Sequence, residues 1–504
     1  MKNKIHTNFG LCRFILLLCV SCFNLVTLAW EIKKNSAALL ENVQKSVVSI
    51  KVQMIKVPYI LDNTMLGTGV GTGFVIDKEA GLILTNKHIS DSSRIEHLEV
   101  SFFNGKEIKA ELLYSDPWHD FALIAVDKKE IPDVVRAIPL STKGAKMGQS
   151  VFMVGSNEGQ SFSLQTGTIS SIYQNFGFFP NQSIRISLNS RGGSSGSPVC
   201  DESGAAIAIQ CGGNDTFAHA LPIEYIQSAL PAVKNNSIPK RRDIGAMLDY
   251  YSLDRAVRFF NFPKELVNEY TKAFPDARNN ALIIESIFSD SPANESLKIG
   301  DIIWAVEGKT IGPNLHQLQK IFNENEKVKL SVYRNGKIEN IEVTTYDLES
   351  ARLKEMISFG GAMFFKADDL TRVLVDAKLG ELLIGYAQPG SSFESNIPGL
   401  PWGRAGRLVL LRALKLNGKE LDSLNTLAQL IPSLITKKDL LLEYKNYLIE
   451  QTYNDSLQTS RRNALSDVRY SGYDDVPTYF KYNDKTHRWN SSLIEANSLL
   501  SKLQ

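Results

Sequence analysis

The chain has 504 residues, and at roughly 100 to 200 residues per domain this length predicts about three domains. The composition, 43% hydrophobic and 22% charged, is ordinary for a globular protein and excludes the disordered, collagen-like and coiled-coil classes. With 56 basic and 54 acidic residues, the formal net charge of +2 gives no reason to expect a nucleic-acid binder.

Residues 1–29 have the pattern of a secretory signal peptide. Basic residues precede an apolar run that begins at Phe14, and the segment contains no acidic residue. The run is shorter than the roughly 20 apolar residues that a membrane-spanning helix needs. Thr27 and Ala29 are small enough to flank a cleavage site before Trp30. We therefore expect export to a bacterial periplasm, with a secreted location or an organellar lumen as the alternatives.

From about residue 36 to residue 235, short apolar runs alternate with Gly, Asn and Asp. Many short strands separated by turn signals are typical of a β-sandwich or barrel. The runs that predict strands are 47–52, 73–76, 82–85, 121–126, 151–154 and 205–209. A polar stretch containing Pro239, from 235 to 242, predicts a domain boundary.

Beyond this boundary, two segments of the sequence resemble each other. The matching pieces, in the same order, are 245–247 with 361–363 and 300–309 with 406–419. Two copies of a module of roughly 110 residues explain these matches. In each copy a Gly-Lys turn is followed by a helical pattern, which in the first copy contains Leu315, Leu318 and Phe322. The dipeptide Asn335-Gly336 predicts a β-hairpin in the first copy.

Three local sequences in the first domain are best explained together. His88 ends a predicted strand in L-T-N-K-H-I, and Asp120 directly precedes another in D-P-W-H-D-F-A-L-I-A-V. Ser195 lies in the Gly-rich turn G-G-S-S-G-S-P-V. The chain order His, Asp, Ser is that of chymotrypsin-type enzymes and differs from the orders in subtilisin and the α/β-hydrolases.

These residue types have defined roles in nucleophilic catalysis. A serine hydroxyl is a weak nucleophile, so His88 would take its proton, while Asp120 would hold the imidazole in the correct tautomer. The amides of Gly193 and Ser195 would converge on the carbonyl oxygen of the scissile bond as an oxyanion hole. His119 abuts Asp120, but adjacent strand residues point to opposite faces, which favours His88 as the base.

The sequence resembles the HtrA/Deg family of trypsin-like serine proteases with C-terminal PDZ domains. Besides the three triad segments, the resemblance rests on T-G-F-V-I at 72–76, V-G-S-N at 154–157, T-G-T-I-S-S at 166–171, H-A-L-P-I at 219–223 and K-I-G-D-I-I-W-A-V-E-G-K at 298–309. It implies a mainly β chain with a chymotrypsin-like double β-barrel protease domain followed by two α/β PDZ domains. The expected boundaries are 30–238 for the protease, 243–347 for the first PDZ domain, 355–450 for a divergent second PDZ domain and 451–504 for an extension of unassigned role.

The resemblance also implies function. We expect an exported, ATP-independent serine endopeptidase that degrades unfolded or damaged proteins, binds substrate tails through its PDZ domains and forms homo-oligomers built on trimers. No cofactor is implied, and no pair among the other histidines shows a metal-ligand spacing near Cys or acidic residues. Two alternatives stay open. One is a PDZ-based chaperone or scaffold with weak or switched-off proteolysis, and the other is an esterase that uses the same triad.

Further site residues follow from the resemblance. The implied substrate-pocket residues are Asn189, Ser190, Arg191, His219, Ala220 and Leu221. The implied loops for a peptide carboxylate are Ile244, Gly245 and Ala246 in the first PDZ copy and Phe359, Gly360 and Gly361 in the second. Ser194 and Ser197 depart from the family's Asn and Gly, and Ser194 is a rival nucleophile by proximity. The polar segment 189–191 puts the family's small-aliphatic cleavage preference in doubt.

Two cysteines lie outside the signal segment. Cys200 and Cys211 flank the predicted turn after Ser195. A tight hairpin would place each of them opposite a residue other than its partner, so we expect two buried thiols rather than a disulfide.

Overall fold

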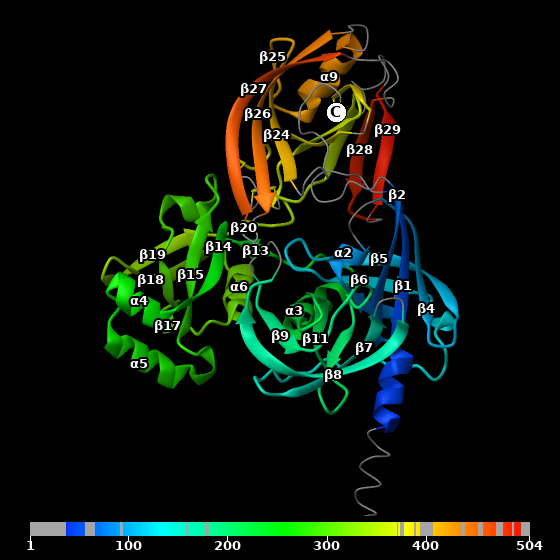
Figure 1. The fold of residues 1–504 in the computed structure, drawn as a ribbon, viewed down its shortest axis with the longest axis vertical. Coiled ribbons are helices and arrows are strands. Elements are labelled where there is room, and N and C mark those ends of the chain that lie inside the picture. The colour runs from blue at the N-terminus through cyan, green and yellow to red at the C-terminus, as the bar shows by residue number, and fades with distance from the viewer. Residues whose placement is uncertain are drawn as a thin grey trace, which may run out of the picture.

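The structure is a computed structural model. It describes residues 37–494 except for 56–65, 91–93, 158–159, 177–180, 370, 373–376, 388–389, 394–406, 435–438, 452–456, 470–476 and 486–487. The predicted signal segment therefore lies outside the described residues. Three units follow one another along the chain (Figure 1), and we call them the protease unit (37–234), the PDZ unit (242–347) and the C-terminal unit (355–494).

The protease unit consists of two closed β-barrels, each built from six antiparallel strands. The first barrel contains β1 (Val47–Ile55), β2 (Leu66–Asp77), β3 (Leu82–Thr85), β4 (Arg94–Phe102), β5 (Glu107–Ser115) and β6 (Ala122–Val126). The second contains β7 (Ser150–Asn157), β8 (Gln160–Gln174), β9 (Ser183–Ser187), β10 (Pro198–Cys200), β11 (Ala206–Gly213) and β12 (Ala218–Pro222). This arrangement confirms the predicted chymotrypsin-like double barrel.

The barrels close because their strands have an apolar face. In β5, buried and exposed residues alternate over the first half of the strand, as expected when one face packs inward and the other faces water. Separate apolar clusters fill the two barrels, around Ile50 in the first and Ile186 in the second. A third cluster joins the barrels and buries helix α3 (Ile223–Lys234) through Ile226 and Ala229.

The PDZ unit is an antiparallel sheet in which β14 forms one edge. Its strands are β14 (Ala246–Ser252), β15 (Asn280–Ile287), β16 (Ile302–Val306), β17 (Lys309–Thr310), β18 (Lys327–Arg334) and β19 (Lys337–Thr344), and its helices are α4 (Leu253–Phe260), α5 (Lys264–Ala273) and α6 (Leu315–Glu324). As predicted, α6 buries Leu315, Leu318 and Phe322. The predicted hairpin at Asn335-Gly336 joins β18 to β19, and both residues have the positive φ that a two-residue turn of this kind requires.

The C-terminal unit repeats this strand order. Its corresponding elements are β22 (Ala362–Lys366), β23 (Leu382–Ala387), β24 (Arg407–Leu416), β25 (Lys419–Glu420), α9 (Leu424–Leu434), β26 (Asp439–Gln451) and β27 (Leu457–Arg469). The sheet then continues on the outer side of β22 with β21 (Glu355–Phe359), β28 (Thr478–Asn483) and β29 (Arg488–Leu493). Strands therefore extend past residue 450, into the segment for which the sequence predicted no role.

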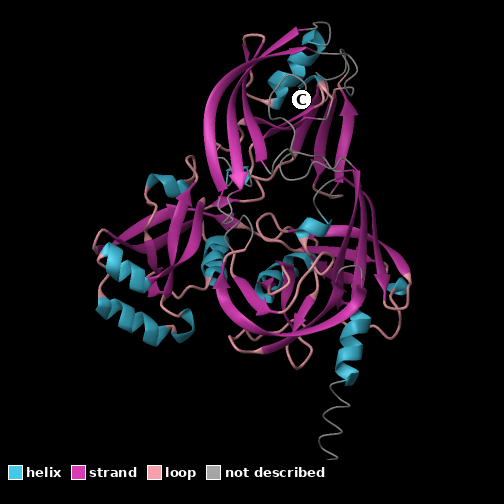
Figure 2. Ribbon diagram, viewed as in Figure 1, coloured by secondary structure: helices cyan, strands magenta, loops and turns pink. Residues whose placement is uncertain are grey.

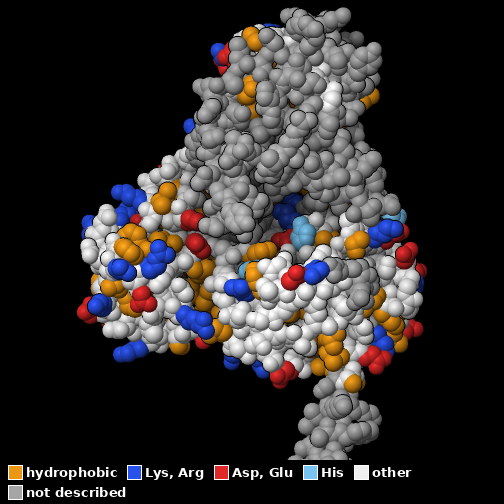
Figure 3. Space-filling model, in the orientation of Figure 1, with side chains coloured by type: hydrophobic (Ala, Val, Ile, Leu, Met, Phe, Trp, Pro, Cys, Tyr) orange, Lys and Arg blue, Asp and Glu red, His pale blue; other side chains and the backbone are white. Residues whose placement is uncertain are grey.

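The arrangement in space places the three units against one another (Figure 2). Trp118 of the protease unit packs with Phe288 of the PDZ unit and with Leu348, and all three side chains are buried. On the face drawn in Figure 3, basic and acidic side chains are interspersed over the protease and PDZ units. No helix within the described ranges is both long enough and apolar enough to cross a bilayer.

Candidate active site

His88 and Asp120 meet at the ends of neighbouring strands in the first barrel. His88 lies in the short helix α2 (Lys87–Ser90), which follows β3, and Asp120 stands just before β6, the partner of β3. The Nδ1 atom of His88 lies 2.7 Å from Oδ2 of Asp120, and the backbone amide of His88 donates to Oδ1 at 3.0 Å. One carboxylate therefore fixes both the ring and the backbone of the histidine.

The electrostatics of this pair suit a general base. Burial lowers the pKa of His88, whereas the charge of Asp120 and its hydrogen bond raise the pKa. Together these two effects of Asp120 outweigh burial, so the pKa of His88 lies above its usual value of 6.5. The side chain keeps 45% of its surface exposed, which leaves the second ring nitrogen accessible to a substrate. Asn86 holds the loop in place because its Nδ2 donates to the carbonyl of Asp120 at 2.8 Å.

Ser195 lies in a tight turn that the first barrel braces. Thr72 of β2 donates through its amide to the carbonyl of Ser195 and through its hydroxyl to the carbonyl of Gly193, each at 2.8 Å. Gly196 has φ of +90°, and a Cβ there would lie 1.8 Å from the carbonyl oxygen of Thr72, so only glycine fits. The two barrels thus meet at the nucleophile turn.

The same turn presents two backbone donors. Gly193 has φ of +94°, a conformation that favours glycine. Neither its amide nor the amide of Ser195 donates to any atom of the described residues. Two unengaged amides beside a serine hydroxyl are what an oxyanion hole requires. The hydroxyl of Ser195 has no hydrogen bond to His88 within the described part of the chain, and such contacts are often long before substrate binds.

The two serines that depart from the family pattern support the turn. Ser194 is 1% exposed and donates through its hydroxyl to the carbonyl of Arg191 at 2.6 Å, so it does not compete with Ser195 for substrate. Ser197 is fully buried, and its hydroxyl donates to the carbonyl of Ser194 at 2.6 Å. His119 is also buried and faces Asp116, at 3.1 Å from Nδ1 to Oδ1, and not His88.

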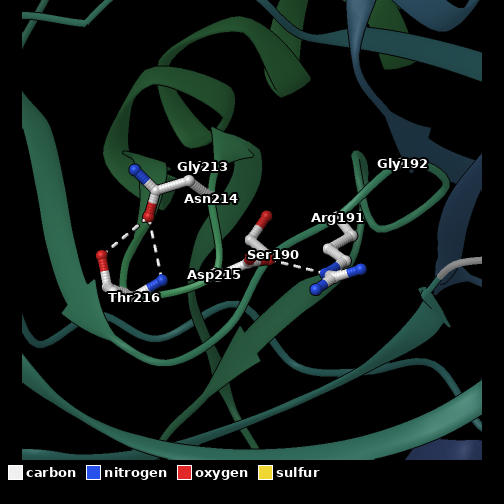
Figure 4. Close-up of a pocket in the computed structure, with 7 residues that line it drawn as sticks. All are labelled: Ser190, Arg191, Gly192, Gly213, Asn214, Asp215 and Thr216. Carbon is white, nitrogen blue, oxygen red and sulfur yellow. Dashed lines mark hydrogen bonds and ion pairs between the residues drawn. The ribbon is translucent and has the colours of Figure 1, made fainter.

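A polar cavity of about 670 Å³ lies next to this turn (Figure 4). It is lined by Ser190, Arg191, Gly192, Gly213, Asn214, Asp215 and Thr216. Arg191 and Asp215 form an ion pair across it, with 2.6 Å between Nε and Oδ1. Gln210 supports one wall, because its Nε2 donates to the hydroxyl of Ser190 at 2.6 Å.

The structure brings together only part of the predicted pocket. Ser190 and Arg191 line the cavity, whereas Asn189, His219, Ala220 and Leu221 do not. His219 is 8% exposed in β12, where its Nδ1 lies 3.1 Å from the hydroxyl of Ser183. Sequence reasoning missed the far wall, formed by residues 213–216. The turn signal Gly-Gly-Asn-Asp before β12 marks that wall as a loop but does not show that it lies opposite residues 190–192.

The two predicted carboxylate-binding loops lie in different surroundings. Ile244, Gly245 and Ala246 lead into the edge strand β14, as the PDZ prediction requires. Gly360 and Gly361 instead form the two-residue turn of a hairpin, in which Phe359 pairs with Ala362. Strand β21 therefore covers the edge of β22 that corresponds to the outer edge of β14, where the PDZ sheet ends.

A buried polar cluster connects the loop before Asp120 to the next unit. Asp116 accepts hydrogen bonds from the amides of Trp118 and His119, and from Nε of Arg241 at 2.6 Å. Burial alone would raise the pKa of Asp116, but the charge of Arg241 holds it well below its usual range. On the other side, Nε2 of His119 lies 3.3 Å from Oε1 of Gln319 on α6. The PDZ unit thus contacts the segment that positions the catalytic carboxylate.

Comparisons with known proteins agree with this architecture. Residues 71–209 match the family model described as a trypsin-like peptidase domain, and residues 268–345 match a PDZ domain. The chain is 27% identical over 425 residues to the Pro-apoptotic serine protease NMA111 of Saccharomyces cerevisiae, an alignment that covers 82% of this chain and 41% of the yeast protein. These matches support a serine endopeptidase of HtrA type, with a trypsin-like peptidase domain and a PDZ domain.

A second relative also matches over only part of its length. The protein of the same name in Candida glabrata is 30% identical over 338 residues, which cover 64% of this chain and 34% of that protein. The chain spans less than half the length of these curated relatives. A solved structure of the HtrA-type protease AlgW with a tripeptide covers 62% of this chain at 19% identity and a TM-score of 0.45.

Proposed function

We propose that this HtrA-type chain is an exported, ATP-independent endopeptidase that hydrolyses peptide bonds in unfolded polypeptides. The observation that carries the proposal is the arrangement around Ser195: the His88–Asp120 pair on one side and the unengaged amides of Gly193 and Ser195 on the other. A base, an orienting carboxylate and an oxyanion hole are the parts that acyl transfer requires.

The reaction follows from these parts. Ser195 Oγ attacks the scissile carbonyl while Nε2 of His88 takes the hydroxyl proton, and Asp120 stabilises the resulting imidazolium. The negative charge on the carbonyl oxygen is stabilised by the two amides. His88 then protonates the leaving amine, and an acyl-enzyme remains on Ser195. Water, activated by His88, hydrolyses this ester and restores the serine.

The test is mass spectrometry of the fragments from an unfolded substrate such as reduced casein. We expect internal cleavages without added ATP, and we expect none from the Ser195→Ala variant. If Ser195→Ala cleaved as fast as the unchanged chain, the nucleophile assignment would be wrong. Small esters tested alongside casein would show whether the chain is instead an esterase. Light scattering on the same sample would test the proposed trimer-based assembly, and cell fractionation would test export to the periplasm.

One observation favours a second candidate, a chaperone with proteolysis switched off. In this structure the hydroxyl of Ser195 makes no hydrogen bond to His88 within the described residues, so the proton path of the triad is not closed. A chaperone would suppress the aggregation of an unfolded protein and cleave nothing under any condition. The fragment analysis and a turbidity assay on one sample separate the two functions.

A further inference from the structure

A PDZ domain recognises a peptide through two features of one sheet edge. The peptide adds as a strand to the edge, and backbone amides of the preceding loop hold its terminal carboxylate. In the PDZ unit the edge strand is β14, and the loop is Ile244, Gly245 and Ala246. The state of this loop therefore decides whether a substrate tail can bind.

The polar groups of this loop already have partners within the chain. The carbonyls of Ile244 and Gly245 accept from the amides of Ala293 and Phe288, each at 3.0 Å. The amide of Gly245 donates to Oδ1 of Asp243 at 2.7 Å. The amide of the central glycine of this loop is thus bound to a carboxylate that belongs to the chain itself.

Asp243 has the features of an internal ligand for this loop. Its side chain is 3% exposed. Burial and the nearby Asp369 raise the pKa of Asp243, to about 7, whereas the amides of Gly245, Ala246 and Ile244 act in the opposite direction and favour its charged form. Of the three amides that would bind the carboxylate of a peptide, that of Gly245 is hydrogen-bonded to Asp243.

Neighbouring units cover the same site. Arg372 of the C-terminal unit lies 4.5 Å above the ring of Phe288, and it pairs with Asp290 and Asp369. On the edge strand, Nδ2 of Asn175 from the protease unit donates to the carbonyl of Leu248 at 2.9 Å. A peptide would have to displace these contacts as well as Asp243.

We propose that the PDZ unit is capped by its own Asp243, whose carboxylate occupies the place of a peptide's terminal carboxylate. The carboxylate of Asp243 is tethered two residues from the amide of Gly245, so its effective concentration at that amide is far above the concentration of a peptide present at micromolar levels. A free peptide therefore competes poorly for the same amide. The apparent dissociation constant of a tail is the intrinsic constant divided by the fraction of molecules that are uncapped, so capping weakens the observed binding. In the capped state, substrates reach Ser195 without capture of their C-termini by this unit.

The proposal depends on the PDZ assignment and not on proteolysis, so its test uses the full chain with Ser195→Ala, which cannot consume the probe. The probes are fluorescent octapeptides ending in each apolar residue, made both as free acids and as C-terminal amides. Fluorescence anisotropy gives the ratio of the two dissociation constants, which reports recognition of the carboxylate alone. Glu269→Gln removes an exposed carboxylate from the same unit and is the matched control.

We expect the Ser195→Ala chain and its Glu269→Gln control to bind acid and amide within twofold of each other. Asp243→Ala should bind the best acid at least tenfold more tightly than its amide. Asp243→Asn, which keeps an acceptor for Gly245 but removes the charge, should give an intermediate ratio. If thermal melting shows that Asp243→Ala does not fold, the near-isosteric Asp243→Asn variant is compared instead with the chain in which Asp243 is intact.

Two results would overturn the proposal. One is tenfold discrimination in favour of the acid by the chain with Asp243 intact, which would show that the loop is already open. The other is an acid-to-amide ratio that the Asp243 variants leave unchanged, including the case in which no probe binds at all. If the chain with Ser195 intact did not cleave casein, the proposed function would be contradicted, but the ratio of acid to amide binding would still test the Asp243 proposal.

Discussion

Arg241 donates through Nε to Oδ2 of Asp116 at 2.6 Å, and both side chains are almost completely buried, at 4% and 0% exposure. Arg241 belongs to the segment that leads from the protease unit into the PDZ unit, and Asp116 lies in the loop that ends at Asp120. Lys87, which directly precedes His88, donates through Nζ to the carbonyl of Asp116 at 2.8 Å. Asp116 therefore links the segment between the protease and PDZ units, through Arg241, to the residue that precedes His88, through Lys87.

Replacing Arg241 should destabilise the chain strongly. Arg241→Ala leaves the carboxylate of Asp116 buried without its cation, and breaking a buried pair in this way costs about 3–5 kcal/mol. Urea unfolding followed by circular dichroism measures the change. The exposed pair of Lys327 and Glu342 is the control, and Lys327→Ala should cost less than about 1 kcal/mol. Equal effects of the two substitutions would contradict a special role for Arg241.

The pH dependence of cleavage should follow the ionisation of His88. Only the neutral imidazole accepts the proton of Ser195, and the net effect of burial and Asp120 places the pKa of His88 above 6.5. The value of kcat/KM should therefore rise with pH through a midpoint above 6.5. Asp120→Asn should lower this midpoint and reduce kcat by about 10⁴-fold, the loss found when the orienting Asp of a triad is replaced. A midpoint below 6.5 in the unchanged chain would exclude this electrostatic account.

The cleavage preference should respond to the ion pair across the polar cavity. Arg191→Ala leaves the carboxylate of Asp215 without its partner, so the cavity should favour basic side chains at the cleavage site. The pair is exposed and worth roughly 1 kcal/mol at most, which corresponds to about a fivefold change in the ratio of kcat/KM for Arg over Val substrates. Asp215→Ala should change the ratio in the opposite direction. A ratio that neither variant alters would show that this cavity does not receive the substrate side chain.

The last strands should protect the C-terminal unit from self-association. Strand β28 pairs with β21, and Ile494 is 2% exposed in the core of this unit. A chain ending at residue 476 lacks both, so the outer edge of β21 loses its partner strand. Light scattering should show larger particles for the truncated chain than for the full chain. Tyr479→Phe, which removes one hydrogen bond to Glu355, is the control and should not change particle size.

Much of the catalytic centre could be predicted from sequence because its signals are local. His88 lies in the short helix after β3, Asp120 lies directly before β6 and Ser195 lies in the turn before β10. The chain order of the three residues selects one type of serine enzyme. The repeat of strand order after residue 242 followed in the same way from short matching motifs and from the spacing of Leu315, Leu318 and Phe322. These features depend on neighbours in sequence.

What the sequence did not show depends on contacts between distant segments. The cavity wall at 213–216 lies opposite residues 190–192, which are distant from it in sequence, and no local pattern shows this. In the sequence, Ser194 is a rival nucleophile because it directly precedes Ser195. Its burial follows only from the folded turn, in which its hydroxyl donates to the carbonyl of Arg191, and the sequence alone does not show this. The direction of the Asp243 side chain is likewise set by the loop that follows it.

The pairing of β21 with β28 has a consequence for synthesis. Strand β21 begins at Glu355, but its outer partner starts only at Thr478, and the residues between them form most of the same sheet. Because a chain emerges from the ribosome starting at its N-terminus, both barrels are complete before β28 has been made. A nascent chain therefore holds a complete protease unit while the C-terminal sheet still lacks the strand that pairs with the outer edge of β21, and this sheet can be completed only once β28 has been made.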